Sequence, residues 1–187
     1  ILDYNGYKEN PLMTVEGIEE INNISKKNNV YVKSICADFF MEAPLHSLDK
    51  EVSKKSREVL ITLIKNSEKI GVKNIVIPCV DQSSLRNEKE IELFVKQLRK
   101  VINQVKNSDV YLSLETDLPP SKVSFLLKMI DCKTVKVNYD TGNSAALGYD
   151  IKEEFAEYGN FISDIHIKDR LVDGGSVFFG TGDFNYH

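Results

Sequence analysis

The sequence predicts an α/β fold in which parallel strands alternate with helices and close into a barrel. Five short runs of β-branched or apolar residues alternate with longer segments that carry apolar residues at helical spacing. Such alternation implies right-handed crossovers and a parallel sheet. No GxGxxG motif or Walker-type loop is present, which disfavours an open nucleotide-binding sheet. A polar residue at each strand end favours a barrel, whose carboxyl-terminal rim holds the site.

Five amphipathic helices are expected, because apolar residues recur three and four positions apart. They span residues 15–27, 50–70, 88–105, 121–130 and 151–158. Thr14 and Asn87 precede the first and third of these helices and are favoured N-cap residues. Gly71 follows the second, where a helix-ending glycine is expected.

Five strands are expected around these helices, since each run is short and rich in β-branched residues. They span residues 30–37, 73–78, 110–115, 135–140 and 162–168. Phe39, Phe40 and Met41 follow the first strand and are expected either to wall an apolar side of the pocket or to pack as loop aromatics. His46 is expected at the surface, and His187, at the end of the chain, has no expected role.

The composition indicates a soluble globular domain. With 187 residues, 42% of them hydrophobic, the chain is long enough to bury a sizeable core. Its 24 basic and 28 acidic residues are interspersed and give a net charge of −4, so nucleic acid is a poor partner. Three cysteines without a CxxC pair favour a reducing, cytoplasmic compartment. No apolar stretch approaches the roughly 20 residues that cross a bilayer, so no membrane partner is expected.

Polar residues that end neighbouring strands are expected to meet at one rim of the barrel. Asp38 and Asp81 follow the first two strands, while Glu115, Asp140 and His166 end the next three, about one strand-plus-helix unit apart. Two carboxylates and an imidazole make a divalent metal site, and their oxygen-rich ligation favours Mn²⁺ or Mg²⁺. Each residue alone has a plainer alternative, as a hydrogen-bonded core histidine or as a helix N-cap aspartate. Because Glu115, Asp140 and His166 recur at the same point of three successive units, the metal site is favoured over these alternatives.

Six runs along the chain carry a resemblance to a known family: SICADFFMEAPL, GVKNIVIPCVDQSSL, LSLETDLPP, VNYDTGNSAALGYD, DIHIKDR and FGTGDF. The most specific pieces are Asp-Thr-Gly-Asn at residues 140–143 and His-Ile-Lys-Asp at residues 166–169. In this order, over nearly the whole chain, they resemble the xylose-isomerase-like superfamily of sugar phosphate isomerases and epimerases. Its members include hexulose-phosphate isomerases, ketose 3-epimerases and, more distantly, DNA-repair enzymes of the endonuclease IV type.

The resemblance implies a (β/α)₈ TIM barrel with one divalent metal held by Glu, Asp, His and Glu on the fifth to eighth strands. Glu115, Asp140 and His166 match the first three ligands, and the fourth has no match. Mn²⁺ or Mg²⁺ is the expected ion, with Zn²⁺ or Co²⁺ as alternatives. Eight strand-plus-helix units need roughly 250 residues. Residues 1–187 are therefore expected to form a single, incomplete barrel domain, about strands two to seven, truncated at both ends.

The implied activity is isomerisation or epimerisation of a sugar or sugar phosphate by proton transfer through an enediolate. Glu115 is implied as both metal ligand and catalytic acid/base group. The eighth-strand Glu would be its partner in inverting a carbon centre, so the activity of this chain by itself is expected to be severely impaired.

Substrate contacts are implied for Lys168, Arg170 and Asn143, although either basic residue alone is also a plausible solvated charge. The glycine-rich loop after the last strand is expected to cradle a phosphate through backbone N–H groups. It consists of Gly180, Thr181 and Gly182. A flexible turn is the alternative for this loop.

Two other functional classes are considered. An endonuclease-IV-like phosphodiesterase is disfavoured, because Asn143 replaces its extra histidine, only three histidines are present and the net charge is negative. A non-catalytic sugar-binding barrel is favoured if the native protein lacks the eighth-strand Glu. The choice between isomerase and epimerase stays open at this point, and so does homo-oligomerisation through the unpaired edges of an incomplete barrel.

Overall fold

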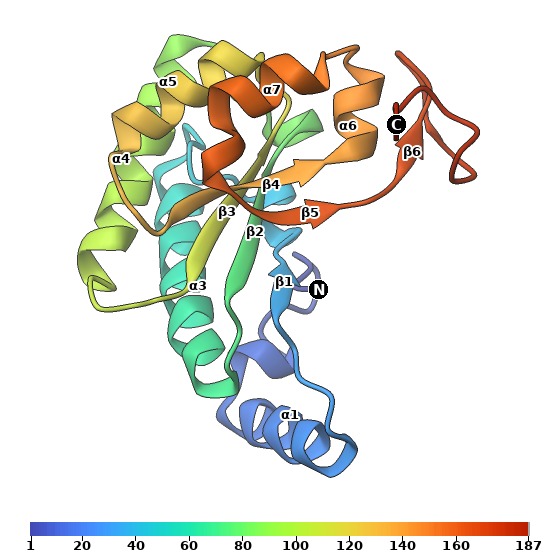
Figure 1. Cartoon of the computed structure of the whole chain (residues 1–187). Coiled ribbons are helices and arrows are strands. Elements are labelled where there is room, and N and C mark those ends of the chain that lie inside the picture. Colours follow the sequence, from blue (N-terminus) through green and yellow to red (C-terminus); the bar gives the residue numbers. More distant parts are fainter. Residues whose placement is uncertain (187) are drawn as a thin grey trace.

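The computed structural model describes residues 1–186, in which five parallel strands form one curled sheet (Figure 1). The strands are β1 (Ser34–Cys36), β2 (Asn74–Cys79), β3 (Tyr111–Thr116), β4 (Val135–Asp140) and β5 (Ile162–His166). They pair in chain order, and every neighbouring pair is parallel. The predicted alternation, parallel sheet and incomplete barrel are therefore confirmed. His187 lies outside the described residues.

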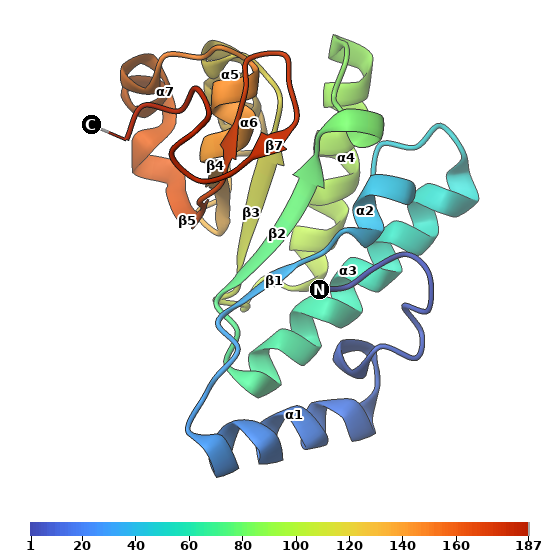
Figure 2. The same ribbon diagram turned by 90° about the vertical axis from the view of Figure 1, so that its right-hand side faces the viewer.

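The helices lie between consecutive strands, except for the first helix, which precedes β1. They are α1 (Val15–Asn28), α2 (Phe39–Glu42), α3 (Lys50–Ile70), α4 (Glu88–Gln104), α5 (Pro120–Ile130), α6 (Thr141–Ala146) and α7 (Ile151–Tyr158). The longer ones contact one another in the order α1, α3, α4, α5, α7, and Figure 2 shows α3 and α4 running along one side of the sheet. Short 3₁₀ turns span Pro11–Met13, Asp81–Ser83 and Gly159–Phe161, and after β5 an antiparallel pair forms from β6 (Asp169–Arg170) and β7 (Ser176–Val177).

The predicted helix ends are confirmed where they are marked by specific residues. The Thr14 side chain accepts a hydrogen bond from Gly17 N, and Asn87 accepts one from Glu90 N. Gly71 ends α3 with φ +73, a left-handed conformation that glycine adopts without strain. Within residues 1–186, no helix has both the length and the apolar character needed to span a bilayer.

The two faces of the sheet differ in chemistry, because successive side chains of a strand point to opposite faces. On β3, Leu114 is 1% exposed and belongs to the core. Ser113 points the other way, and its Oγ lies 2.8 Å from Ser163 Oγ of β5. Ser34 of β1 donates a hydrogen bond to Asp164 of β5. The sheet therefore curls far enough for side chains of its first and last strands to meet.

The core lies between the sheet and the surrounding helices. Its largest fully buried side chains are Phe39, Phe40, Phe94, Leu2, Ile35, Leu45, Leu60, Leu63, Ile64, Ile75, Ile77 and Leu85. Burying each of these side chains contributes about 1.5–3 kcal/mol. Phe39 and Phe40 are thus core residues of α2, while Met41 lines a cavity described below.

β1 is shorter than predicted. It spans Ser34–Cys36, whereas the β-branched run predicted residues 30–37. Val30, Tyr31 and Val32 precede the strand and are 69%, 48% and 37% exposed. These side chains favour extended structure, but among the described residues the β1–β2 ladder begins only at Ser34.

The expectation that His46 lies at the surface is wrong. Its side chain is 7% exposed, and its ring centroid lies 6.2 Å from that of Phe94. Its Nδ1 has no hydrogen-bond partner among the described residues. Burial lowers the pKa of His46 against an opposing effect of Glu90, so the ring stays neutral in the folded protein.

Because the pKa of the buried His46 is lowered, we expect the folded protein to lose stability in mild acid. Below pH 6.5 the unfolded chain binds a proton at this residue and the folded protein does not, so the free energy of unfolding falls as the pH drops from 6.5 toward the lower folded-state pKa. The slope from one such group is at most about 1.4 kcal/mol per pH unit. We expect urea unfolding of a His46→Leu variant to show a smaller drop between pH 7.5 and 5.0 than the parent. Equal drops in both proteins would contradict this assignment.

Candidate metal centre

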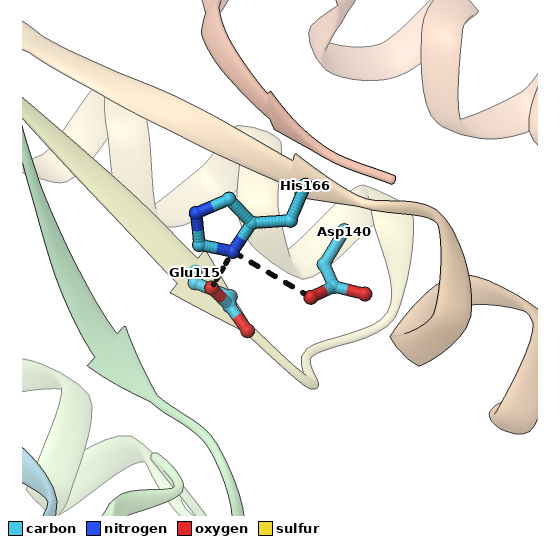
Figure 3. A group of neighbouring side chains, drawn as sticks. All are labelled: Glu115, Asp140 and His166. Atoms are coloured by element: carbon cyan, nitrogen blue, oxygen red, sulfur yellow. Dashed lines mark ion pairs between the residues drawn. The ribbon is translucent and has the colours of Figure 1, made fainter. Parts of the chain in front are cut away.

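Glu115, Asp140 and His166 converge at the carboxyl ends of β3, β4 and β5 (Figure 3). The register of β4 and β5 pairs Asp140 with His166. His166 Nδ1 lies 3.2 Å from Glu115 Oε2 and 3.7 Å from Asp140 Oδ2. One candidate ligand atom from each residue lies within 4.8 Å of the other two. Both carboxylates are buried, and the imidazole is half-buried. The structure thus brings together the three residues that the sequence predicts to meet.

The charges in this cluster are mutually compensated. Burial acts to raise the pKa of Asp140, but His166, Lys168 and the backbone N–H of Asn143 together hold that pKa below its usual range. Asp140 and Glu115 raise the pKa of His166 to about 10, against the opposing effect of burial. Lys168 Nζ lies 2.9 Å from Asp140 Oδ2. Two cationic side chains therefore offset the two carboxylates at neutral pH.

The donor set fits a divalent cation. Asp140 Oδ2 is buried, and among the described residues it accepts no hydrogen bond of good geometry, although Lys168 forms an ion pair with it. Lys168 already supplies a positive charge to this oxygen, so a bound cation would take the place of that ion pair. Two carboxylates and one imidazole match the ligand preferences of Mg²⁺, Mn²⁺ and Zn²⁺.

The Asp-Thr-Gly-Asn run organises the cluster from the start of α6. Asp140 Oδ1 accepts a hydrogen bond from Asn143 N at 2.9 Å, so Asp140 caps the helix and also faces the cluster. Thr141 Oγ1 donates to the Lys168 carbonyl and accepts from Lys168 N. A Cβ on Gly142 would lie 2.5 Å from Lys168 Cγ. Glycine is therefore required for the Lys168 side chain to pass this close to α6.

Glu115 is held at both carboxylate oxygens. Asn138 Nδ2 donates to Oε2 and Asn143 Nδ2 donates to Oε1, each at 2.8 Å. Arg170 Nη1 in turn donates to Asn143 Oδ1 at 3.0 Å. Arg170 also donates twice to the Gly174 carbonyl, from Nε at 3.1 Å and from Nη2 at 2.8 Å. The orientation of Glu115 is thus set by side chains from β4, α6 and β6.

Residues 3–187 match the sequence model of a family described as xylose isomerase-like TIM barrel. The chain belongs to this family. This match confirms the family resemblance that the sequence carries, and the curled parallel sheet agrees with the TIM barrel fold of that family.

Individual relatives match the chain at low sequence identity. The chain is 26% identical over 149 residues to SgbU of Haemophilus influenzae, a protein provisionally named an L-ribulose-5-phosphate 3-epimerase; the match covers 76% of the chain and 52% of SgbU. A xylose isomerase domain protein of Planctomyces limnophilus superposes with a TM-score of 0.78 at 17% identity, covering 93% of this chain and 70% of that one. A xylose isomerase-like TIM barrel protein of Mycobacterium smegmatis in complex with magnesium superposes with a TM-score of 0.70 at 18% identity. The match covers 94% of this chain and 66% of that one. The chain spans about half the length of the curated relative.

A cavity of about 480 Å³ opens in front of the cluster in this xylose isomerase-like chain. Its lining includes the three cluster residues and Lys168. Across from them lies Cys36, whose Sγ donates to Asp38 Oδ1 at 2.9 Å. Burial, followed by this hydrogen bond, raises the pKa of the Cys36 thiol far above its usual range, so the residue is a neutral thiol. A cavity of this volume accommodates a sugar-sized molecule.

The glycine-rich loop is already bound to a carboxylate of the chain. Gly180 N and Gly182 N donate to Asp169 Oδ2 at 2.9 and 2.8 Å, and Phe184 N donates to Oδ1. Thr181 N donates to the Phe178 carbonyl. The backbone N–H groups that the sequence offers for phosphate are therefore engaged elsewhere. These loop residues do not line the cavity in front of the cluster.

Arg170 and Asn143 do not line that cavity either. They border a second cavity of about 230 Å³, together with Asp117. Asn138 is the supporting residue that sequence reasoning missed. It lies two positions before Asp140 on β4, and residues two apart on a strand share a face, which is the signal that points to it.

Proposed function

We propose that Glu115, Asp140 and His166 hold one divalent cation, Mg²⁺ or Mn²⁺, in the active site of a sugar or sugar phosphate isomerase or epimerase. The observation that carries this proposal is the convergence of the three side chains at the mouth of a sugar-sized cavity. Two relatives support the proposal. The Haemophilus influenzae protein is named as a sugar phosphate epimerase, and the Mycobacterium smegmatis protein was solved in complex with magnesium.

The bound cation would supply a fixed positive charge for the oxyanion that develops on the sugar during proton removal. Glu115 acts as the acid/base group: its carboxylate takes the proton from the carbon next to the carbonyl, which leaves an enediolate, and returns it in the next step. The amides of Asn138 and Asn143 keep this carboxylate in place during both transfers. Lys168, which lines the same cavity, contacts a sugar hydroxyl or phosphate.

Inversion of a carbon centre needs a second acid/base group on the opposite face of the enediolate. In the family that the sequence resembles, that group lies on an eighth strand. Glu115 by itself is expected to exchange the substrate proton with solvent without inverting the centre.

A solvent-exchange experiment tests the proposed function. The chain is loaded with Mn²⁺, its metal content is measured, and it is incubated in D₂O with free and phosphorylated ketopentoses and ketohexoses. We expect about one Mn²⁺ per chain, and deuterium on the carbon next to the carbonyl of at least one sugar, observed by NMR. Folded protein without bound metal would contradict the metal site. Bound metal without deuterium exchange on any sugar would contradict the acid/base role and favour a sugar-binding protein.

A further inference from the structure

Asn143 contacts one oxygen of each carboxylate in the cluster. Its backbone N–H donates to Asp140 Oδ1 at 2.9 Å, and its side-chain Nδ2 donates to Glu115 Oε1 at 2.8 Å. The remaining oxygens, Asp140 Oδ2 and Glu115 Oε2, are the two that lie nearest to His166 Nδ1. Asn143 therefore occupies the outer oxygen of both carboxylates. The inner oxygens face the imidazole, where Glu115 Oε2 also accepts from Asn138 and Asp140 Oδ2 also pairs with Lys168.

We propose that Asn143 is a positioning residue that selects the carboxylate oxygens presented to the cation, and that Arg170 fixes its orientation. This inference rests on the proposed function, because it assigns a role within the same metal centre. It gives Asn143 a task other than the substrate contact expected from the sequence.

The orientation of the Asn143 amide follows from its two neighbours. A carboxylate only accepts hydrogen bonds, and a guanidinium only donates them. With Arg170 Nη1 at its Oδ1, Asn143 must turn Nδ2 toward Glu115 Oε1. A rotation of the amide by 180° would place Nδ2 against the donor Arg170 Nη1, and Oδ1 against the acceptor Glu115 Oε1. Arg170 thus determines which end of the amide meets Glu115.

Arg170 is itself anchored. Its Nε and Nη2 both donate to the Gly174 carbonyl in the turn that follows β6. Gly142, which has no Cβ, leaves room for the Arg170 stem, because a Cβ there would lie 3.1 Å from Arg170 Cγ. A chain of hydrogen bonds therefore runs from the Gly174 carbonyl through Arg170 and Asn143 to Glu115.

The experiment measures Mn²⁺ affinity by electron paramagnetic resonance, which detects free and bound ion separately. Asn143→Ala removes the contact with Glu115 and keeps the backbone N–H on Asp140. We expect the Mn²⁺ dissociation constant to rise about 10-fold or more, as for other residues that orient metal ligands. Arg170→Met is expected to weaken Mn²⁺ binding in the same direction, and Arg170→Lys to restore part of it, because lysine still donates to Asn143 Oδ1. Arg170→Met in the Asn143→Ala background is expected to cause no further loss.

Asn66 provides a matched control. It is as buried as Asn143, at 8% exposure, and its Nδ2 donates to the Leu12 carbonyl at 2.9 Å, outside the metal centre. Asn66→Ala is expected to lower thermal stability and leave Mn²⁺ affinity unchanged. Unchanged affinity in Asn143→Ala, or an equal loss in Asn66→Ala, would overturn the positioning role. A parent chain that is folded and binds no Mn²⁺ would instead overturn the metal centre, and with it this role.

Discussion

Replacing Asp140 or His166 with alanine is expected to abolish Mn²⁺ binding while the chain stays folded. Each change removes a ligand from a three-residue set, and His166→Ala also removes the imidazole that lies 3.2 Å from Glu115 and 3.7 Å from Asp140. The strands that carry these residues are held by the ladder and the core, which neither change touches. Metal content by elemental analysis, together with a thermal unfolding curve, checks both parts of this expectation.

Asp140→Ala also removes the cap of α6, which costs about 0.5–2 kcal/mol of stability. Asp150 provides the control for that loss, because it caps α7 through Lys152 N and Glu153 N and is exposed. Asp150→Ala is expected to lower stability by a similar amount and to bind Mn²⁺ normally. Normal metal content in both Asp140→Ala and His166→Ala would show that the cluster is not a metal centre.

Glu115→Gln is expected to reduce deuterium exchange into the sugar by at least about 100-fold, because an amide is too weak a base to take the proton. Some Mn²⁺ binding is retained through Asp140, His166 and the remaining carbonyl oxygen. The variant is also expected to be less stable by about 1–3 kcal/mol, because the charged acceptor of the Asn138 and Asn143 amides is lost, and the new NH₂ group meets an amide NH₂ unless Asn138 turns its Oδ1 toward it.

A double substitution separates these two effects. In Glu115→Gln with Asn143→Asp, the glutamine NH₂ donates to the new carboxylate, which also accepts from Arg170. We expect stability to recover toward that of the parent and deuterium exchange to stay low. Exchange at the parent rate in Glu115→Gln, with metal bound, would exclude Glu115 as the acid/base group.

The repeating unit of the chain explains why so much of the fold could be predicted. Parallel strands separated by helices have two common arrangements, an open sheet and a barrel, and Thr14, Asn87 and Gly71 mark helix ends through local hydrogen bonding and backbone conformation. Glu115 and Asp140 could be placed for the same reason, because consecutive parallel strands end at the same edge of the sheet.

The surroundings of other residues could not be predicted from the sequence, because they depend on contacts between distant parts of the chain. His46 is buried because its ring packs against Phe94, 48 positions further along the sequence. The N–H groups of Gly180 and Gly182 are engaged because the loop folds back on Asp169. Neither contact leaves a local pattern, since a glycine-rich run has the same composition whether or not its N–H groups are occupied.

The meeting of β1 and β5 has a consequence for the order of folding. Neighbouring strands are joined by one helical connection, so each can be added to the sheet through closure of a modest loop. The contact between Ser34 and Asp164 joins residues 130 positions apart and requires all the intervening units to be in place. We expect the cluster of Glu115, Asp140 and His166 to form before this contact, because it needs only the neighbouring strands β3, β4 and β5.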